Sequence, residues 1–250
     1  MLTFTLLNVA TGGADNLCEL MEIPRRKSMR LRGYDYSQPG GYFVTICTRN
    51  RVCTFGEIRD GHMSLSPTGE LVRRCWEAIP SHFGNTSVDL FQVMPNHLHG
   101  IVKIREHDDI VGVECIQPLR ETRGGGQRTR RNRYQHIIPG SLGSIIRSFK
   151  AAVTREVRRI LTRRRDRIWQ RSFYDHVVRS DIDHFFIERY IELNPILWHL
   201  DSDNPDAHNT SVEEVKRALK EHLGPDGLAI EYLIDFEMNY RAWKEMEGDL

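Results

Sequence analysis

Two histidines placed two residues apart are the first candidates for chemistry in this chain. His97 and His99 lie in the apolar run VMPNHLHGIVKI at positions 93–104. Because successive side chains of a strand point to opposite faces, both imidazoles would face the same side and could hold one metal ion. Such a pair is more often incidental, and neither His-x-His-x-Asp-His nor His-Glu-x-x-His occurs in this chain. Other residues must decide between a metal site and incidental packing.

A tyrosine and an asparagine four residues apart form a second candidate pair. Tyr190 and Asn194 stand in DIDHFFIERYIELNP (181–195), which predicts a helix that ends at Pro195. Residues four apart on a helix share a face, so both side chains can point into one site. A tyrosine in such a run is more often a core residue, so packing and catalysis both stay open at this point.

The charges of the chain are strongly segregated along its length. Sixteen Lys or Arg against three acids lie between Arg120 and Arg171, whereas residues 201–250 hold thirteen acids against five bases. The basic segment is typical of a surface that binds nucleic acid, and the alternative is a solvated helix face beside a basic loop. The candidates for DNA contact are Arg147, Lys150, Arg155, Arg158, Arg159, Arg163, Arg164 and Arg171, together with Tyr34 and Tyr36.

Two further expectations concern this charge pattern. Lys150 interrupts the apolar stripe of its helix, so it either approaches the site or extends along the helix edge into solvent. The acidic tail is expected to fold back on the basic helix and to limit non-specific DNA binding.

The elements that must position these residues follow from the hydrophobic pattern. Their order is strand, helix, strand, strand, helix, strand, at 41–50, 66–82, 88–95, 98–104, 141–165 and 168–180, with the helix at 181–195 after them. A short hairpin turning at Asp60-Gly61 precedes the first helix. This order predicts an α+β domain with helices packed on one face of a ferredoxin-like antiparallel sheet, in which the strand carrying His97 and His99 is central.

Composition favours a globular cytoplasmic protein. Of the 250 residues 40% are hydrophobic, yet no apolar run approaches the ~20 residues that a membrane span needs. The opening MLTFTLLNVATGG lacks the basic leading region of a secretory signal. The five cysteines are odd in number and form no Cys-x-x-Cys pair, which argues against a disulfide framework or a zinc knuckle.

Five segments, taken in order, resemble one known family. The chain is similar to the REP-associated tyrosine transposases, within the wider group of HUH (His-hydrophobic-His) single-strand nucleases. The similar segments are RLRGYDYSQPGGYFVTICTRNR (30–51), VMPNHLHGIV (93–102), SIIRSFKAAVTR (144–155), WQRSFYDHVVR (169–179) and RYIELNP (189–195). The resemblance implies a catalytic domain over residues 28–198 with a basic Gly-rich insertion at 105–140. Residues 1–27 would be an N-terminal extension and 199–250 an acidic helical appendage.

The resemblance also implies an activity. Tyr190 would be the nucleophile of a DNA strand transferase, and His97, His99 and Asn194 would hold Mg²⁺ or Mn²⁺, although relatives often have Gln at the position of Asn194. The substrate would be single-stranded or hairpin DNA from repetitive extragenic palindromes, cut through a 5′-phosphotyrosine intermediate by a nucleoid-associated monomer or homodimer. The alternatives are a DNA- or RNA-binding protein without turnover and a metal-dependent phosphodiester hydrolase. The tyrosine separates the hydrolase, which would use metal-bound water, from the strand transferase.

Overall fold

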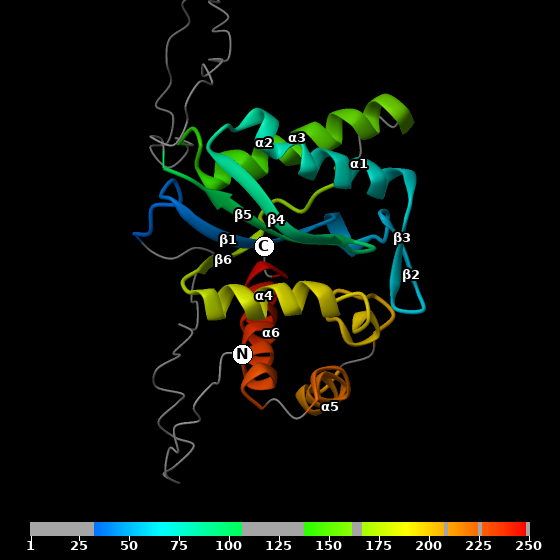
Figure 1. Cartoon of the computed structure of the whole chain (residues 1–250). Coiled ribbons are helices and arrows are strands. Elements are labelled where there is room, and N and C mark those ends of the chain that lie inside the picture. Colours follow the sequence, from blue (N-terminus) through cyan, green and yellow to red (C-terminus); the bar gives the residue numbers. More distant parts are fainter. Residues whose placement is uncertain (1–32, 107–137, 162–166, 208–209, 225–226, 249–250) are drawn as a thin grey trace, which may run out of the picture.

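The fold is built on a four-stranded sheet whose strands come from distant parts of the chain. The computed structural model describes residues 33–106, 138–161, 167–207, 210–224 and 227–248 (Figure 1). The predicted N-terminal extension, most of the predicted insertion, and Arg163 and Arg164 lie outside the described residues.

The sheet has the predicted ferredoxin-like order. Its strands are β1 (Gly40–Cys47), β4 (Thr86–Val93), β5 (His97–Ile104) and β6 (Tyr174–Val178), and they run in the order β4-β5-β1-β6. Every neighbouring pair is antiparallel. The hairpin of β2 (Gly56–Arg59) and β3 (His62–Leu65) turns at Asp60-Gly61, as predicted, and both turn residues have left-handed φ angles. The α+β fold class predicted from the sequence is therefore confirmed, with β5 between two partners.

One face of the sheet is covered by the helices that precede and follow β4 and β5. These are α1 (Pro67–Glu77), α2 (Ile79–His82) and α3 (Leu142–Leu161), which lie together in Figure 1. Their apolar side chains form one core with Tyr42, Val44 and Leu98 of the sheet. A side chain at Gly100 would come within 2.5 Å of the Trp76 ring, so glycine at this position allows α1 to pack close to β5.

The opposite face of the sheet is covered as well. Helices α4 (Asp181–Leu193) and α6 (Gly227–Gly248) lie across it, and α5 (Val212–Leu223) packs against α6 (Figure 1). A second core joins Phe43 and Ile101 of the sheet to Phe186 of α4 and to Phe236 and Trp243 of α6. We expected helices on one face of the sheet. The structure has a second helical layer on the other face, and the C-terminal residues complete this layer.

This second layer corrects the expectation about the acidic tail. Helix α6 packs on α4 and on the sheet face that looks away from α3 (Figure 1). The predicted folding of the tail onto the basic helix is wrong, because the apolar residues of α6 find their partners on the opposite side of the sheet. Within the described ranges, no helix combines the length and the apolar character that a membrane span requires.

Candidate metal and tyrosine site

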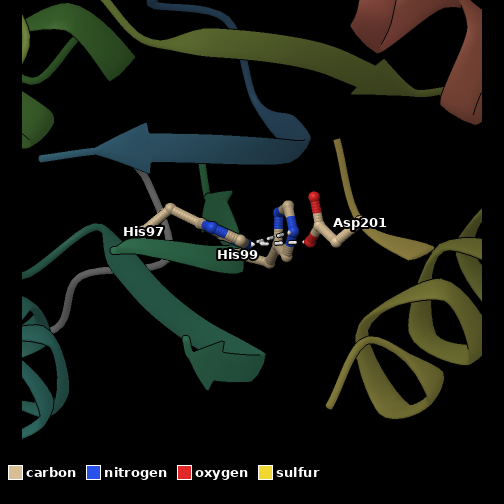
Figure 2. A group of neighbouring side chains, drawn as sticks. All are labelled: His97, His99 and Asp201. Atoms are coloured by element: carbon tan, nitrogen blue, oxygen red, sulfur yellow. Dashed lines mark hydrogen bonds and ion pairs between the residues drawn. The ribbon is translucent and has the colours of Figure 1, made fainter. Parts of the chain in front are cut away.

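Strand β5 presents the two histidines to the face that α4 and α6 cover. Cys47 and Thr45 of β1 stand opposite His97 and His99 in the antiparallel register. The alternation of the strand sends Leu98 into the first core and turns both imidazoles to the other face, as predicted. Both rings are completely buried. Figure 2 shows them beside one another, with Asp201 approaching from a separate segment.

The hydrogen bonds around His97 define which of its nitrogens carries hydrogen. The Asn96 amide donates from Nδ2 to the carbonyls of Arg51 (3.0 Å) and Asp203 (2.6 Å), so its Oδ1 is left as an acceptor. Nδ1 of His97 lies 2.9 Å from this Oδ1 and must therefore be the donor. In the neutral ring, Nε2 then has a bare lone pair, as a metal ligand requires.

The second histidine, His99, contacts His97 and also a hydroxyl group, which can either donate or accept a hydrogen bond. Its Nε2 lies 2.9 Å from Nε2 of His97, and its Nδ1 lies 2.9 Å from Oγ1 of the buried Thr45. If the Thr45 hydroxyl donates, Nε2 of His99 carries hydrogen and donates to His97. If the hydroxyl instead accepts, two lone pairs face each other, an arrangement that a cation would stabilise.

Both histidines are held in the neutral form. Burial lowers the pKa of His97, the charge of Asp203 opposes this effect, and the cations Arg51 and Lys244 add to it, so that the pKa falls to about 4. Burial lowers the pKa of His99 well below its usual value, and His97 adds to this effect. Neutral imidazole is the ligating form, so neither ring must lose a proton before it binds a metal near neutral pH.

Asp201 adds a carboxylate that the sequence reasoning missed. It follows a single helical turn at Trp198–Leu200, and its Oδ2 lies 3.8 Å from Nε2 of His97. One ligand atom each from His97, His99 and Asp201 lie within 4.8 Å of one another. Burial raises the pKa of Asp201 well above its usual range, and the charge of Asp203 adds to the effect. A cation in this group would therefore favour loss of the carboxyl proton.

Asp203 is also close but is already paired. Its carboxylate accepts from the Tyr240 hydroxyl and forms ion pairs with Arg51, at 2.7 Å, and with Lys244. Burial alone would raise the pKa of Asp203, but the charges of Arg51, His97 and Lys244 outweigh it and lower the pKa to about 2. Asp203 therefore stays ionised and ties the C-terminal segment to β1 and β5.

The predicted tyrosine stands beside the histidines. Ser180 caps helix α4, since its side chain accepts from the amide of Asp183, and the Tyr190 ring of this helix packs on Phe43 of the sheet. The ring centroids of Tyr190 and His99 are 5.3 Å apart. The hydroxyl donates to Glu237 of α6 at 2.9 Å. Burial raises the pKa of Tyr190 well above its usual value, and the nearby charge of Glu237 raises it further.

Asn194 lies at the end of the same helix. It shares one pocket with Tyr190, Asp201 and Glu237, and its side chain interacts with His97. Although it lies near His97, its buried Oδ1 makes no hydrogen bond of normal geometry with the described residues. A bound cation would satisfy this oxygen, so two imidazoles, one carboxylate and one amide oxygen together fit a divalent metal ion.

The predicted DNA-contacting residues are divided between exposed and packed positions. Arg147, Arg155, Arg158, Arg159 and Arg171 are exposed, and the first four lie on α3. Lys150 does not approach the site, because its ammonium donates to the carbonyls of Gln170 (3.0 Å) and Ser172 (2.7 Å). Helix α3 itself lies on the other side of the sheet from Tyr190 (Figure 1).

The two predicted stacking residues have a packing role. Tyr36 is buried in the core beneath α3, and Tyr34 packs against it with ring centroids 5.0 Å apart. DNA contact by these two rings stays a prediction.

Comparison with known proteins gives one relative of high similarity. No family model matches the chain. An uncharacterized protein of Haemophilus influenzae is 40% identical over 179 residues, which cover 72% of this chain and 93% of that protein. The chain belongs to the same family as this Haemophilus protein.

Two solved structures match at lower similarity. A REP-associated tyrosine transposase bound to a REP hairpin is 20% identical, with a TM-score of 0.43 over 67% of this chain and 72% of that one. A proposed transposase from Deinococcus radiodurans is 15% identical, with a TM-score of 0.35 over 65% of this chain and 95% of that one. Neither match at these values defines what the site of this chain does.

Proposed function

We propose that this protein is a metal-dependent DNA strand transferase that cuts and rejoins single-stranded or hairpin DNA through Tyr190. The observation that carries the proposal is the placement of the Tyr190 ring against His99, with Asn194 and Asp201 lining the same pocket. These residues come from three separate elements. A tyrosine whose ring packs against a neutral imidazole can supply the nucleophile for phosphoryl transfer next to a metal that the imidazoles would hold.

The residues have distinct roles in this reaction. Tyr190 attacks the phosphorus of the scissile phosphodiester and forms a 5′-phosphotyrosine, while the 3′-oxygen leaves. A 3′-hydroxyl can later reverse the step, because the phosphotyrosine keeps the energy of the original bond. His97, His99 and Asp201, with Asn194 as the fourth candidate, would hold the metal. A divalent metal in this position supplies charge that polarises the phosphate and offsets the developing negative charge.

The ligand set favours particular metals. Imidazole nitrogens with carboxylate and amide oxygens suit Mn²⁺ better than Mg²⁺, which prefers oxygen ligands. We expect Mn²⁺ to support the reaction more strongly than Mg²⁺. His97→Ala should lose cleavage and retain most of the DNA affinity, since the exposed arginines of α3 lie on the other side of the sheet.

The nature of the substrate is supported by the sequence resemblance and by the cationic face of α3. Exposed arginines position a phosphate backbone without reading its sequence, which suits a substrate recognised partly by its hairpin shape. A hairpin from a repetitive extragenic palindrome is therefore the substrate to test first. Action as a nucleoid-associated monomer or homodimer remains part of the same proposal.

A covalent adduct tests the proposal. The protein is incubated with Mn²⁺ and an end-labelled hairpin oligonucleotide, and the products are separated under denaturing conditions. We expect a labelled protein–DNA adduct that Tyr190→Phe abolishes and that Tyr42→Phe, the same change at a buried tyrosine of the other core, retains. Free cleaved DNA without an adduct would indicate a hydrolase that uses water. Tight binding without cleavage would indicate a nucleic-acid-binding protein.

A further inference from the structure

Helix α6 brings a carboxylate to the hydroxyl of the proposed nucleophile. Oε2 of Glu237 accepts the hydrogen bond of Tyr190 at 2.9 Å. The phase of α6 is fixed on both sides of Glu237, because Phe236 packs on Phe43 and Tyr190 while Tyr240 packs near His99. Glu237 therefore reaches Tyr190 from a helix that the sequence resemblance does not include.

The carboxylate is also held from its other side. Nε of Arg241, one turn further along α6, donates to Oε1 of Glu237 at 2.8 Å. The same guanidinium donates through another nitrogen to the carbonyl of Thr210 at 3.0 Å. Each oxygen of Glu237 thus has a donor of its own, and Oε2 is directed at the phenol. An acid–base residue works best when its second oxygen is fixed in this way.

We propose that Glu237 is the general base of the strand-transfer reaction, an inference that rests on the proposed function of Tyr190. As the phenol oxygen forms its bond to phosphorus, its proton passes to Oε2 of Glu237. The bond between phosphorus and the 3′-oxygen breaks, its electron pair stays on that oxygen, and the oxygen takes a proton from water. When a 3′-hydroxyl attacks the phosphotyrosine, that hydroxyl loses its proton to the solvent as its oxygen bonds to phosphorus, and Glu237 returns its proton to the phenol oxygen as the bond between that oxygen and phosphorus breaks.

The test is a single-turnover measurement of adduct formation in the full-length protein with Mn²⁺. Glu237→Gln preserves the size of the side chain but cannot accept the proton, so we expect the rate to fall about a hundredfold. Glu237→Ala should show a similar loss, and Glu237→Asp should recover part of the rate because it restores a carboxylate. The matched control is Glu231→Gln, an exposed glutamate on the same helix, which should keep the wild-type rate.

Affinity and fold are measured on the same samples. Hairpin affinity, Mn²⁺ affinity and the thermal unfolding temperature of Glu237→Gln should match those of Glu231→Gln. A Glu237→Gln rate equal to or higher than that of wild type would overturn the inference, since the glutamate would then be neutral or would hold Tyr190 back. Wild-type protein that forms no adduct at all would refute the proposed function and this inference together, so the two failures can be told apart.

Discussion

Removing the Phe236 ring is the most direct test of how the C-terminal helix supports the site. Phe236 is 1% exposed, and its ring lies 4.9 Å from Tyr190, 5.1 Å from Phe43 and 5.3 Å from His176 between centroids. Replacing a buried phenylalanine by alanine costs about 3–5 kcal/mol. Because this ring contacts β1, β6 and α4 at once, we expect Phe236→Ala to lower the free energy of unfolding by about 4 kcal/mol.

Urea unfolding followed by tryptophan fluorescence measures this loss. With a slope of about 2.5 kcal/mol per molar urea, the midpoint should fall by roughly 1.5 M. Met238→Ala on the same helix is the control, because Met238 is 43% exposed and its loss should change stability by less than about 0.5 kcal/mol. A midpoint shift below about 0.4 M for Phe236→Ala would refute the reasoning, since α6 would then contribute little to the stability of the sheet.

Three further predictions concern acid stability, metal binding and DNA binding. Burial tends to raise the pKa of Asp183, but the hydrogen bonds that its carboxylate accepts from His176 and Tyr232 lower the pKa overall. The ionised carboxylate therefore stabilises the folded protein at pH values above its pKa in the unfolded chain, which is near 4, and this stabilisation is lost as the pH falls below that value. The stability gap between wild type and Asp183→Asn should therefore narrow from pH 6 to pH 3 in urea unfolding, and a constant gap would contradict this. Asp201→Asn should weaken Mn²⁺ binding by calorimetry at least tenfold, whereas the exposed Asp206→Asn should leave it unchanged. Changing Arg147 and Arg158 together to glutamine should lower the slope of log affinity against log salt by about 1.4 for a single strand, and an unchanged slope would place the DNA elsewhere.

The parts of the site that could be predicted from the sequence follow from local geometry. His97 and His99 share a face because strands alternate, and Tyr190 and Asn194 share one because they are a helical turn apart. The strand order followed from the order of the elements, since a ferredoxin-like sheet places the third strand in the centre. These relations need no knowledge of how the tail packs.

The residues that could not be predicted depend on contacts between distant segments. Glu237 reaches the site only because α6 docks on the sheet, and Asp201 reaches it from the turn that follows Trp198–Leu200, while the acidic composition around both residues resembled that of an exposed tail. The apolar residues of α6 surround the helix, as is typical of a helix buried on several sides, so no single stripe indicated its partner.

The position of α3 across the sheet from Tyr190 sets a minimum length for any DNA strand that is held on α3 and cut by Tyr190. A helix layer and a sheet together separate the two sides by on the order of 20 Å. If phosphates are held along α3, the strand must pass around a sheet edge to reach the tyrosine. At 3.4 Å for each nucleotide of a stacked strand, this path takes at least about six nucleotides. The distance between α3 and Tyr190 would therefore fix how many nucleotides separate the cut from the point where the DNA is held.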